Sequence, residues 1–520
     1  MAYFTNIHGK YIKDPKLWEQ IAYVKNKIGF SDIVGLEADF ENGIFKRIAN
    51  AEGKTAGQDF DTFPMYGGRR LCNLADDGTV NAWYGEQGYT EDGSNGQVMV
   101  WQPRFYYKMI PLKLQEIVHQ LGETTTAIAN NNTTNPITID GEEVTAVTDD
   151  VATYNSSNFR WDGSKWTTVG ADACGYHILK ARYYISAVRK NGFKLHPAFY
   201  DETGKPVQGI FLSTYEGSIY DVSESKYLKW DEREITYDAG GTPTITNAYP
   251  ANFTADKLSS IAGVKPASGK YNNLTRSNIE KLATNRGAGW HGENIRTASM
   301  EQLLMIIEYA GFDLQTLITQ GVINVTDSPD TENNSNYTGS TASIGEGTGR
   351  ATSSVNERAG YEYTLTAANQ TSFKYRGREN IYGNMWISIN GVNIWGNAKM
   401  YGGMPYICTD YNFVSDKKND NYESAGFTSS QAQNYIKYFG YGNNKYDWLF
   451  MPSKTVATAQ SYVKDCYYLT SNLNAYRVCF LGGHWTRRAA AGGFCWSSRD
   501  ASSCRYRNVG GRSIYIPQSV

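Results

Sequence analysis

The chain lacks the features that mark several large protein classes. Its formal net charge is −2 over 520 residues, so no excess of basic residues predicts a surface for nucleic-acid phosphates. No apolar run reaches the roughly 18 residues needed to cross a bilayer. Residues 1–20 also lack the apolar stretch of a secretory signal. We therefore expect no nucleic-acid partner, no membrane insertion and no signal peptide.

Motifs of common catalytic and metal sites are missing as well. The sequence contains no CxxC, HExxH or GxSxG pattern, and its six histidines show no zinc-ligand spacing. Seven scattered cysteines form a poor disulfide framework and favour synthesis in a reducing cytosol. No pair of acids stands out for glycoside hydrolysis, although two distant acids would leave no local motif. We expect no catalytic residues, no metal and no cofactor.

Aromatic residues and glycine are abundant. Tyr, Phe and Trp make up 14% of the chain, and there are 39 tyrosines and 51 glycines. Short alternating segments separated by Asp-Gly turns, as between residues 33 and 107, predict a strand-rich and loop-rich protein. Tyr and Trp make rigid amphipathic contacts at low entropic cost, so this composition suits a recognition surface.

Two helices and two insertions punctuate this pattern. Residues 14–28 predict a short amphipathic helix, and Ser299–Ala310 predicts a core helix with a capping box made by Ser299 and Gln302. Residues 124–169 and 326–358, rich in Thr, Asn, Ser and Gly, predict surface insertions or long loops. We expect an attachment region at 1–95, with the helix and β-rich segments, followed by a second domain at 96–520.

Two segments combine glycine turns with large aromatics and arginine. One is RGRENIYGNMW at 376–386, in which Arg376 and Glu379 can pair inside a turn. The other, at 482–516, begins GGHW, ends NVGGRSIYI, and contains six arginines but no Lys, Glu, Gln or Met. Glycine permits the positive φ and close backbone approach that tight turns need. Both segments are candidates for a fixed turn framework.

In their order, these motifs resemble the C-type-lectin-like fold of the formylglycine-generating-enzyme group. That group carries GN-hydrophobic-Trp, then GG-x-Trp, then G-x-Arg near the end, and a helix ending like SMEQLLMIIEYA. The resemblance covers roughly residues 96–520 and implies an α+β protein, with a β-rich N-terminal region before a lectin-like fold that carries long loop insertions. Its implied scaffold comprises Arg376, Glu379, Gly383, Asn384, Trp386, Gly482, Gly483, Trp485, Trp496, Gly510, Gly511 and Arg512.

The enzymes of this group hold copper with a cysteine pair just after the GG-x-aromatic turn. Thr486, Arg487 and Arg488 follow that turn here, while Cys495 and Cys504 lie farther on. We therefore expect no oxidase activity, although an oxidase or a glycan hydrolase on the same frame stays an alternative. Calcium occurs in this fold, but the sequence shows no ligand cluster for it.

Residues 482–516 also resemble the variable region of retroelement-diversified proteins, the group that includes phage major tropism determinants. Such retroelements mutate adenines in AAY codons, and an NNY codon cannot encode Lys, Glu, Gln, Met or Trp. The missing Lys, Glu, Gln and Met fit this pattern. The resemblance implies variable, ligand-binding side chains at His484, Thr486, Arg487, Arg488, Ala490, Phe494, Cys495, Ser497, Ser498, Arg499, Asp500, Cys504, Arg505, Tyr506 and Arg507.

Further segments, VMVWQPRFYYK, NGFKLHPAFYD and YRGRENIYGNMW, look like phage tail proteins of gut bacteria. The combined resemblance implies a homotrimeric, receptor-binding protein of the virion, made in the host cytoplasm. Its partners would be other tail proteins and a host surface glycan or protein. A bacterial lectin-like adhesin is the remaining alternative.

Overall fold

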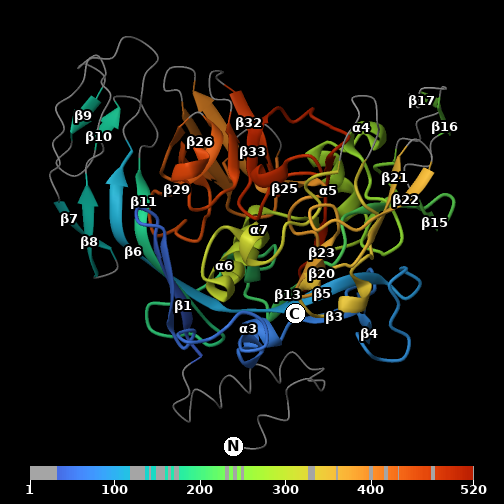
Figure 1. Ribbon diagram of the computed structural model, residues 1–520, viewed down its shortest axis with the longest axis horizontal. Coiled ribbons are helices and arrows are strands. Elements are labelled where there is room, and N and C mark those ends of the chain that lie inside the picture. The colour runs from blue at the N-terminus through green and yellow to red at the C-terminus, as the bar shows by residue number, and fades with distance from the viewer. Residues whose placement is uncertain are drawn as a thin grey trace, which may run out of the picture.

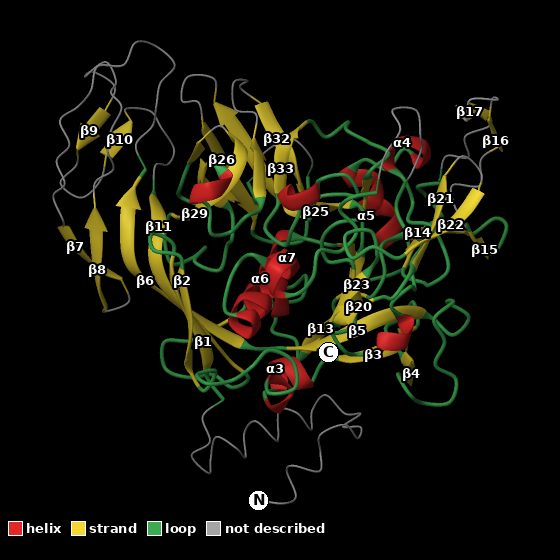
Figure 2. Cartoon of the chain, viewed as in Figure 1, coloured by secondary structure: helices red, strands yellow, loops and turns green. Residues whose placement is uncertain are grey.

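The computed structural model describes residues 32–117, 135–139, 142–147, 159–161, 166–168, 175–228, 234–237, 243–246, 251–325, 334–358, 361–397, 402–414, 420–430, 432–469 and 475–518. The predicted helix at 14–28 lies outside these residues. Strands predominate over helices in the part of the chain described, as the sequence predicts (Figure 2).

One side of the molecule is a sheet of long antiparallel strands (Figure 1). Here β11 pairs with β1 and with β6, and β1 also pairs with β2. Their apolar side chains, such as Val34, Leu36 and Ile185, are fully buried in the main core. These strands span Val34–Asp39 (β1), Ile44–Ala49 (β2), Tyr106–Glu116 (β6) and Tyr176–Ser186 (β11).

A second group of strands continues this sheet through the pairing of β11 with β29. It carries the C-terminal segment, since β33 lies between β31, which runs parallel to it, and β32, which runs antiparallel. The group comprises Trp386–Asn397 (β25), Gly402–Cys408 (β26), Tyr422–Ser424 (β27), Ser429–Ser430 (β28), Ala432–Tyr441 (β29), Pro452–Val456 (β30), Cys466–Leu469 (β31), Ala475–Leu481 (β32), Trp496–Asp500 (β33) and Val509–Gly510 (β34).

A separate six-stranded sheet lies on the opposite side of the molecule from β32 and β33 (Figure 1). In it β5 pairs with β3 and with β13, so strands on both sides of residue 95 share one sheet. The predicted boundary at residue 95 therefore does not separate two structural units among the described residues. The strands are Arg70–Leu74 (β3), Val80–Trp83 (β4), Gln97–Pro103 (β5), Gly209–Ser213 (β13), Trp290–Gly292 (β19) and Ser513–Tyr515 (β35).

The long helix α6, Ile295–Tyr309, lies at the centre of the molecule (Figure 2). The prediction of a core helix is confirmed, but its start and its cap are wrong. Asn294 caps the helix by accepting hydrogen bonds from Arg296 and Thr297, and Thr297 completes the capping box. Ser299 lies within the helix and is fully buried, so the helix begins a turn earlier than the sequence pattern indicates.

Residues 334–358 are not a surface insertion, contrary to the prediction for 326–358. They contain β20 (Gly349–Arg350) and β21 (Ser354–Arg358), and the buried Asn336 donates its backbone N–H to Asn384 Oδ1 over 2.7 Å. In the other predicted insertion, the strand β8 (Glu142–Val147) extends the main sheet beside β6.

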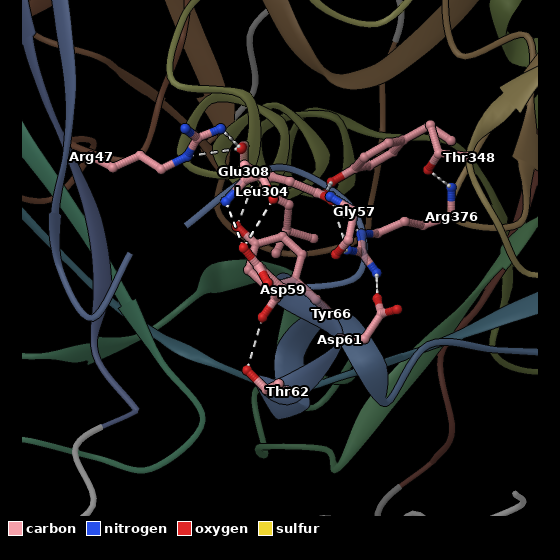
Figure 3. Close-up of polar contacts among 12 residues, drawn as sticks. Arg47, Gly57, Asp59, Asp61, Thr62, Tyr66, Leu304, Glu308, Thr348 and Arg376 are labelled. Carbon is pink, nitrogen blue, oxygen red and sulfur yellow. Dashed lines mark hydrogen bonds and ion pairs between the residues drawn. The ribbon is translucent and has the colours of Figure 1, made fainter. Parts of the chain in front are cut away.

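Arg376 ties three distant segments together beneath α6 (Figure 3). Its guanidinium holds the fully buried Glu308 carboxylate through contacts of 2.6 and 2.7 Å, and reaches Asp61 over 2.7 Å. Tyr375 donates its hydroxyl to the same Glu308 carboxylate. The predicted pairing of Arg376 with Glu379 is therefore wrong, because Glu379 accepts from the backbone of Gly339 and Thr341 instead.

Candidate ligand-binding cleft

The two glycine-rich motifs, about a hundred residues apart in sequence, contact each other directly. Gly383 donates its N–H to the Gly482 carbonyl over 3.0 Å, and Trp485 donates its N–H to the Asn384 carbonyl over 3.1 Å. Gly482 and Gly483 have φ of 101° and 80°, which explains their glycine identity. These contacts fix where the chain enters the 482–516 segment.

The NVGGR motif joins the same framework. Strand β34 runs parallel to β25, with Val509 opposite Trp386, and Trp386 donates its N–H to the Asn508 carbonyl. The fully buried Arg512 guanidinium donates to the carbonyl oxygens of Glu379 and Asn380. The structure thus brings together residues from all three motifs that the resemblance implies as scaffold.

Strand β33 divides the segment into buried and cleft-facing side chains. Side chains alternate between the two faces of a strand. Trp496 and Ser498 face the main core, where Ser498 Oγ lies 3.3 Å from Cys479 Sγ. Ser497 faces the other side and pairs in register with Phe480 and Tyr468. A register shift between Val478 and Phe480 then turns Asp500 to this second side.

Three residues predicted as variable surface are core residues. Phe494 is fully buried among Phe312, Phe439 and Phe450. Cys495 and Ser498 have no exposed area either. The prediction is wrong for these three because reachability by mutation says nothing about the face to which a side chain points.

Seven other predicted residues line one cleft of about 450 Å³. They come from the turn after β32, from β33 and from the loop that follows it: Arg487, Ser497, Arg499, Asp500, Arg505, Tyr506 and Arg507. Lys270 of α4 (Gly269–Asn272), Trp386, Phe480, Asn508 and Val509 complete the lining. The cleft volume falls within the range of about 300–1,000 Å³ that holds small ligands.

Aromatic rings position the arginines of the cleft. The Arg487 guanidinium lies 4.9 Å from the Tyr468 ring centroid and 5.8 Å from that of Trp386. Arg499 lies over the same Tyr468 ring at 5.7 Å, and Arg507 lies 5.9 Å from the Trp485 ring. Cation–π contacts of this kind contribute about 0.5–2 kcal/mol each. These contacts fix the positions of the guanidinium groups over the aromatic rings.

Among the residues that the structure describes, Asp500 is the single acid that lines this cleft. Its Oδ1 accepts a hydrogen bond of 3.0 Å from the Tyr506 hydroxyl, and its Oδ2 lies 3.4 Å from Ser497 Oγ. Arg499 Nε is 3.9 Å away. Four arginines and Lys270 line the cleft together with this carboxylate, which gives the lining a net positive charge.

His484 borders the cleft as a neutral ring. Its side chain is 5% exposed, and Nε2 lies 3.1 Å from Asn508 Nδ2. Burial, followed by the positive charges of Arg487, Arg507 and Arg499, holds the His484 pKa well below its ordinary value. His484 thus adds no charge to a site that is already cationic.

The remaining predicted residues lie beside the cleft without lining it. Arg488 is exposed, and Thr486 and Ala490 are half-buried. Half-buried Cys504 places Sγ 3.5 Å from the Tyr506 hydroxyl. The sequence interpretation missed Lys270 and Tyr468, because tertiary folding alone brings them to this site from other segments.

Two cysteines lie under the cleft, Cys466 at the start of β31 and Cys495 directly before β33. The parallel register, with Tyr467 opposite Trp496, places Cys466 beside Cys495, and both belong to one apolar cluster with Trp386. Burial raises the pKa of Cys466 to about 11 and that of Cys495 well above its ordinary value. Protonated thiols are poor nucleophiles and poor metal ligands. Among the described residues, no three His, Cys, Asp or Glu side chains gather as a metal site.

Comparisons with known proteins give only distant likenesses. No family model and no curated protein matches the chain. Similar solved structures include the Major Tropism Determinant P3c variant, with 10% identity over 90% of this chain and 77% of that chain, at a TM-score of 0.22. The Major Tropism Determinant M1 variant shows 13% identity over 90% and 74% of the two chains, at a TM-score of 0.23. In the part of the chain described, no helix is long and apolar enough to span a membrane.

Proposed function

We propose that this chain is a receptor-binding protein of a phage tail, which recognises a ligand on the host surface through the cleft formed by residues 482–516. One observation carries the proposal: seven residues of the segment that resembles a variable region line one cationic cleft. The lectin-like fold, the diversification of this segment and the virion location belong to the same proposal.

The separation of residues 482–516 into buried and cleft-facing side chains suits receptor binding. Buried residues, among them Trp485, Trp496 and Arg512, hold the backbone through the two glycine motifs. Cleft residues such as Arg499 and Tyr506 contribute little to that framework. Substitutions at exposed positions typically change stability by no more than about 0.5 kcal/mol. A fixed frame can therefore present different side chains to different receptors.

Adsorption of the phage to its host tests the proposal. Replacement of Arg487, Arg499 and Tyr506 together by Ala is expected to abolish adsorption while the protein stays folded, with a melting temperature lowered only as far as the lost cation–π contacts account for. The matched control replaces Lys46, Arg189 and Tyr361, which are exposed residues outside residues 482–516 and outside the cleft lining, by Ala. Normal adsorption by the cleft variant, or equal loss in the control, would contradict the proposal.

An oxidase on the same frame is the enzymatic alternative, and the state of its cysteines speaks against it. The raised pKa values of Cys466 and Cys495 keep both thiols protonated near neutral pH. Turnover of a cysteine-containing peptide by the purified protein, lost on replacement of Cys495 by Ser, would favour the oxidase over receptor binding.

A further inference from the structure

The lining of the cleft carries more positive than negative side chains. Lys270, Arg487, Arg499, Arg505 and Arg507 line it with one acid, Asp500. That carboxylate already accepts from the Tyr506 hydroxyl. Like charges held close together in a partly dehydrated site repel, and a bound anion relieves this repulsion. The charge pattern therefore indicates a ligand with at least one negative group.

Arg487 is built to donate to that group. Its guanidinium stacks over Tyr468 and Trp386, and its Nε is buried without a hydrogen-bond partner. Stacking occupies the face of a guanidinium and leaves its N–H edge free to form paired hydrogen bonds with an oxyanion. A buried donor without an acceptor costs about 1–3 kcal/mol, which a bound oxyanion offsets.

Tyr468 aligns the two arginines that would grip the anion. Its ring lies under both guanidiniums, at 4.9 Å from Arg487 and 5.7 Å from Arg499. It comes from β31, outside the 482–516 segment, and is held opposite Ser497 by the parallel ladder. Tyr468 is thus a positioning residue that belongs to the fixed frame.

The other cleft residues fit a sugar ring better than a flexible acidic side chain. The Tyr506 ring is 45% exposed and offers an apolar face with a hydroxyl edge. Ser497 and Asp500 supply a hydroxyl and a carboxylate for sugar hydroxyl groups. An acidic sugar residue presents an oxyanion, hydroxyls and an apolar ring face together, whereas an aspartate or glutamate side chain presents only the oxyanion.

We propose that the cleft binds an acidic saccharide unit. This inference rests on the proposed receptor-binding function. Arg487 and Arg499, aligned by Tyr468, clamp the carboxylate or sulfate of the saccharide, and Tyr506 covers its ring. A carboxylate and a sulfate share this oxyanion chemistry, so either group fits the clamp. Because Tyr506, Ser497 and Asp500 suit a sugar ring, the ligand class is an acidic host glycan rather than an acidic protein.

Calorimetry with four probes tests the ligand class on the full chain. Oligogalacturonate carries carboxylates, dextran sulfate carries sulfates, dextran is neutral, and poly-glutamate is an acidic peptide. We expect at least one acidic saccharide to bind, with dextran and poly-glutamate at least about tenfold weaker, which corresponds to about 1.4 kcal/mol. Binding of neither acidic saccharide, or equal binding of poly-glutamate, would overturn the inference.

Substitutions at Tyr468 test its positioning role. Tyr468→Leu removes the ring and is expected to weaken the acidic probe about tenfold, as the loss of two cation–π contacts implies. Tyr468→Phe keeps the ring and is expected to bind within about twofold of the parent. If Tyr468→Leu unfolds, Arg487→Lys retains the charge and loses the planar fork, and the same weakening is expected. Unchanged affinity in folded Tyr468→Leu or in Arg487→Lys would overturn the clamp.

The probes and the adsorption assay separate two kinds of failure. If the triple cleft variant loses host adsorption but only poly-glutamate binds, receptor binding stands and the glycan inference fails. If acidic saccharides bind but the triple variant adsorbs normally, the cleft is a saccharide site and the proposed tail function fails.

Discussion

At the scale of the single residue, the buried His291 and its two neighbouring carboxylates stabilise the fold. His291 is held between Glu202 and Glu280, with ring nitrogens 2.7 and 2.8 Å from their carboxylate oxygens. Burial lowers its pKa, but the hydrogen bonds to the two carboxylates outweigh burial and raise the pKa to about 9. The protonated ring therefore stabilises the fold by linking α5 (Arg276–Thr284) to β19.

The raised pKa gives His291 a defined pH dependence. The stabilisation is complete below about pH 6.5, the unfolded value, and is lost as pH rises through about 9. Urea unfolding at several pH values measures this effect. Between about pH 6.5 and 9, the free energy of unfolding of the parent should fall by up to about 3 kcal/mol more than that of His291→Gln. Parallel pH profiles for the two proteins would show that the ring is not charged.

Gly483 illustrates a second constraint on a single residue. Its φ is 80°, and a Cβ there would lie 2.7 Å from the Ala491 Cβ. Gly483→Ala should lower the free energy of unfolding by about 1–3 kcal/mol, because strain and overpacking add. Gly53, with φ of 73° and nothing within 4 Å of an added Cβ, is the matched control. Gly53→Ala should cost less, and an equal loss would mean that packing at Gly483 is unimportant.

At the scale of the element, β33 determines which positions of the segment can vary. Ser497→Asn should cost less than Ser498→Asn, because Ser497, although only 4% exposed, lines the cleft into which the larger amide can extend. Ser498→Asn should cost about 1–3 kcal/mol, since the larger amide must enter a close-packed core. Chemical unfolding of both variants measures the contrast, and equal losses would contradict the assignment of faces.

The sequence contained part of this information. If residues 496–499 are taken as a strand, Trp496 and Ser498 share one face, and the large apolar Trp496 would place Ser498 in the core. Phe494 is a large apolar side chain whose burial follows from its chemistry alone. Lys270 and Tyr468 could not be predicted, because their approach to the cleft depends on helix α4 and on the parallel pairing of β31 with β33.

At the scale of the whole molecule, one continuous core joins segments far apart in sequence. Val34, Leu304 and Ile516 all belong to the main core. Composition and turn spacing predicted a strand-rich protein with a central helix correctly. They could not predict that β3 and β5 pair across residue 95, because sheet partners are set by long-range packing rather than by local pattern.

The cleft lies on the side of the molecule that carries β32, β33 and α4, away from β3, β5 and α3, Pro64–Gly67 (Figure 1). The homotrimer that the sequence resemblance implies would present three such clefts. Light scattering of the purified chain should give three times the 58.1 kDa chain mass.

Because linked sites can raise avidity by about 10²–10⁴, binding to host cells should be tighter by that order than binding of a free monovalent saccharide. Arg487→Lys should weaken both the binding to host cells and the binding of the free saccharide. A monomer that binds cells no more tightly than the free saccharide would contradict multivalent attachment, although the cleft would still bind its ligand.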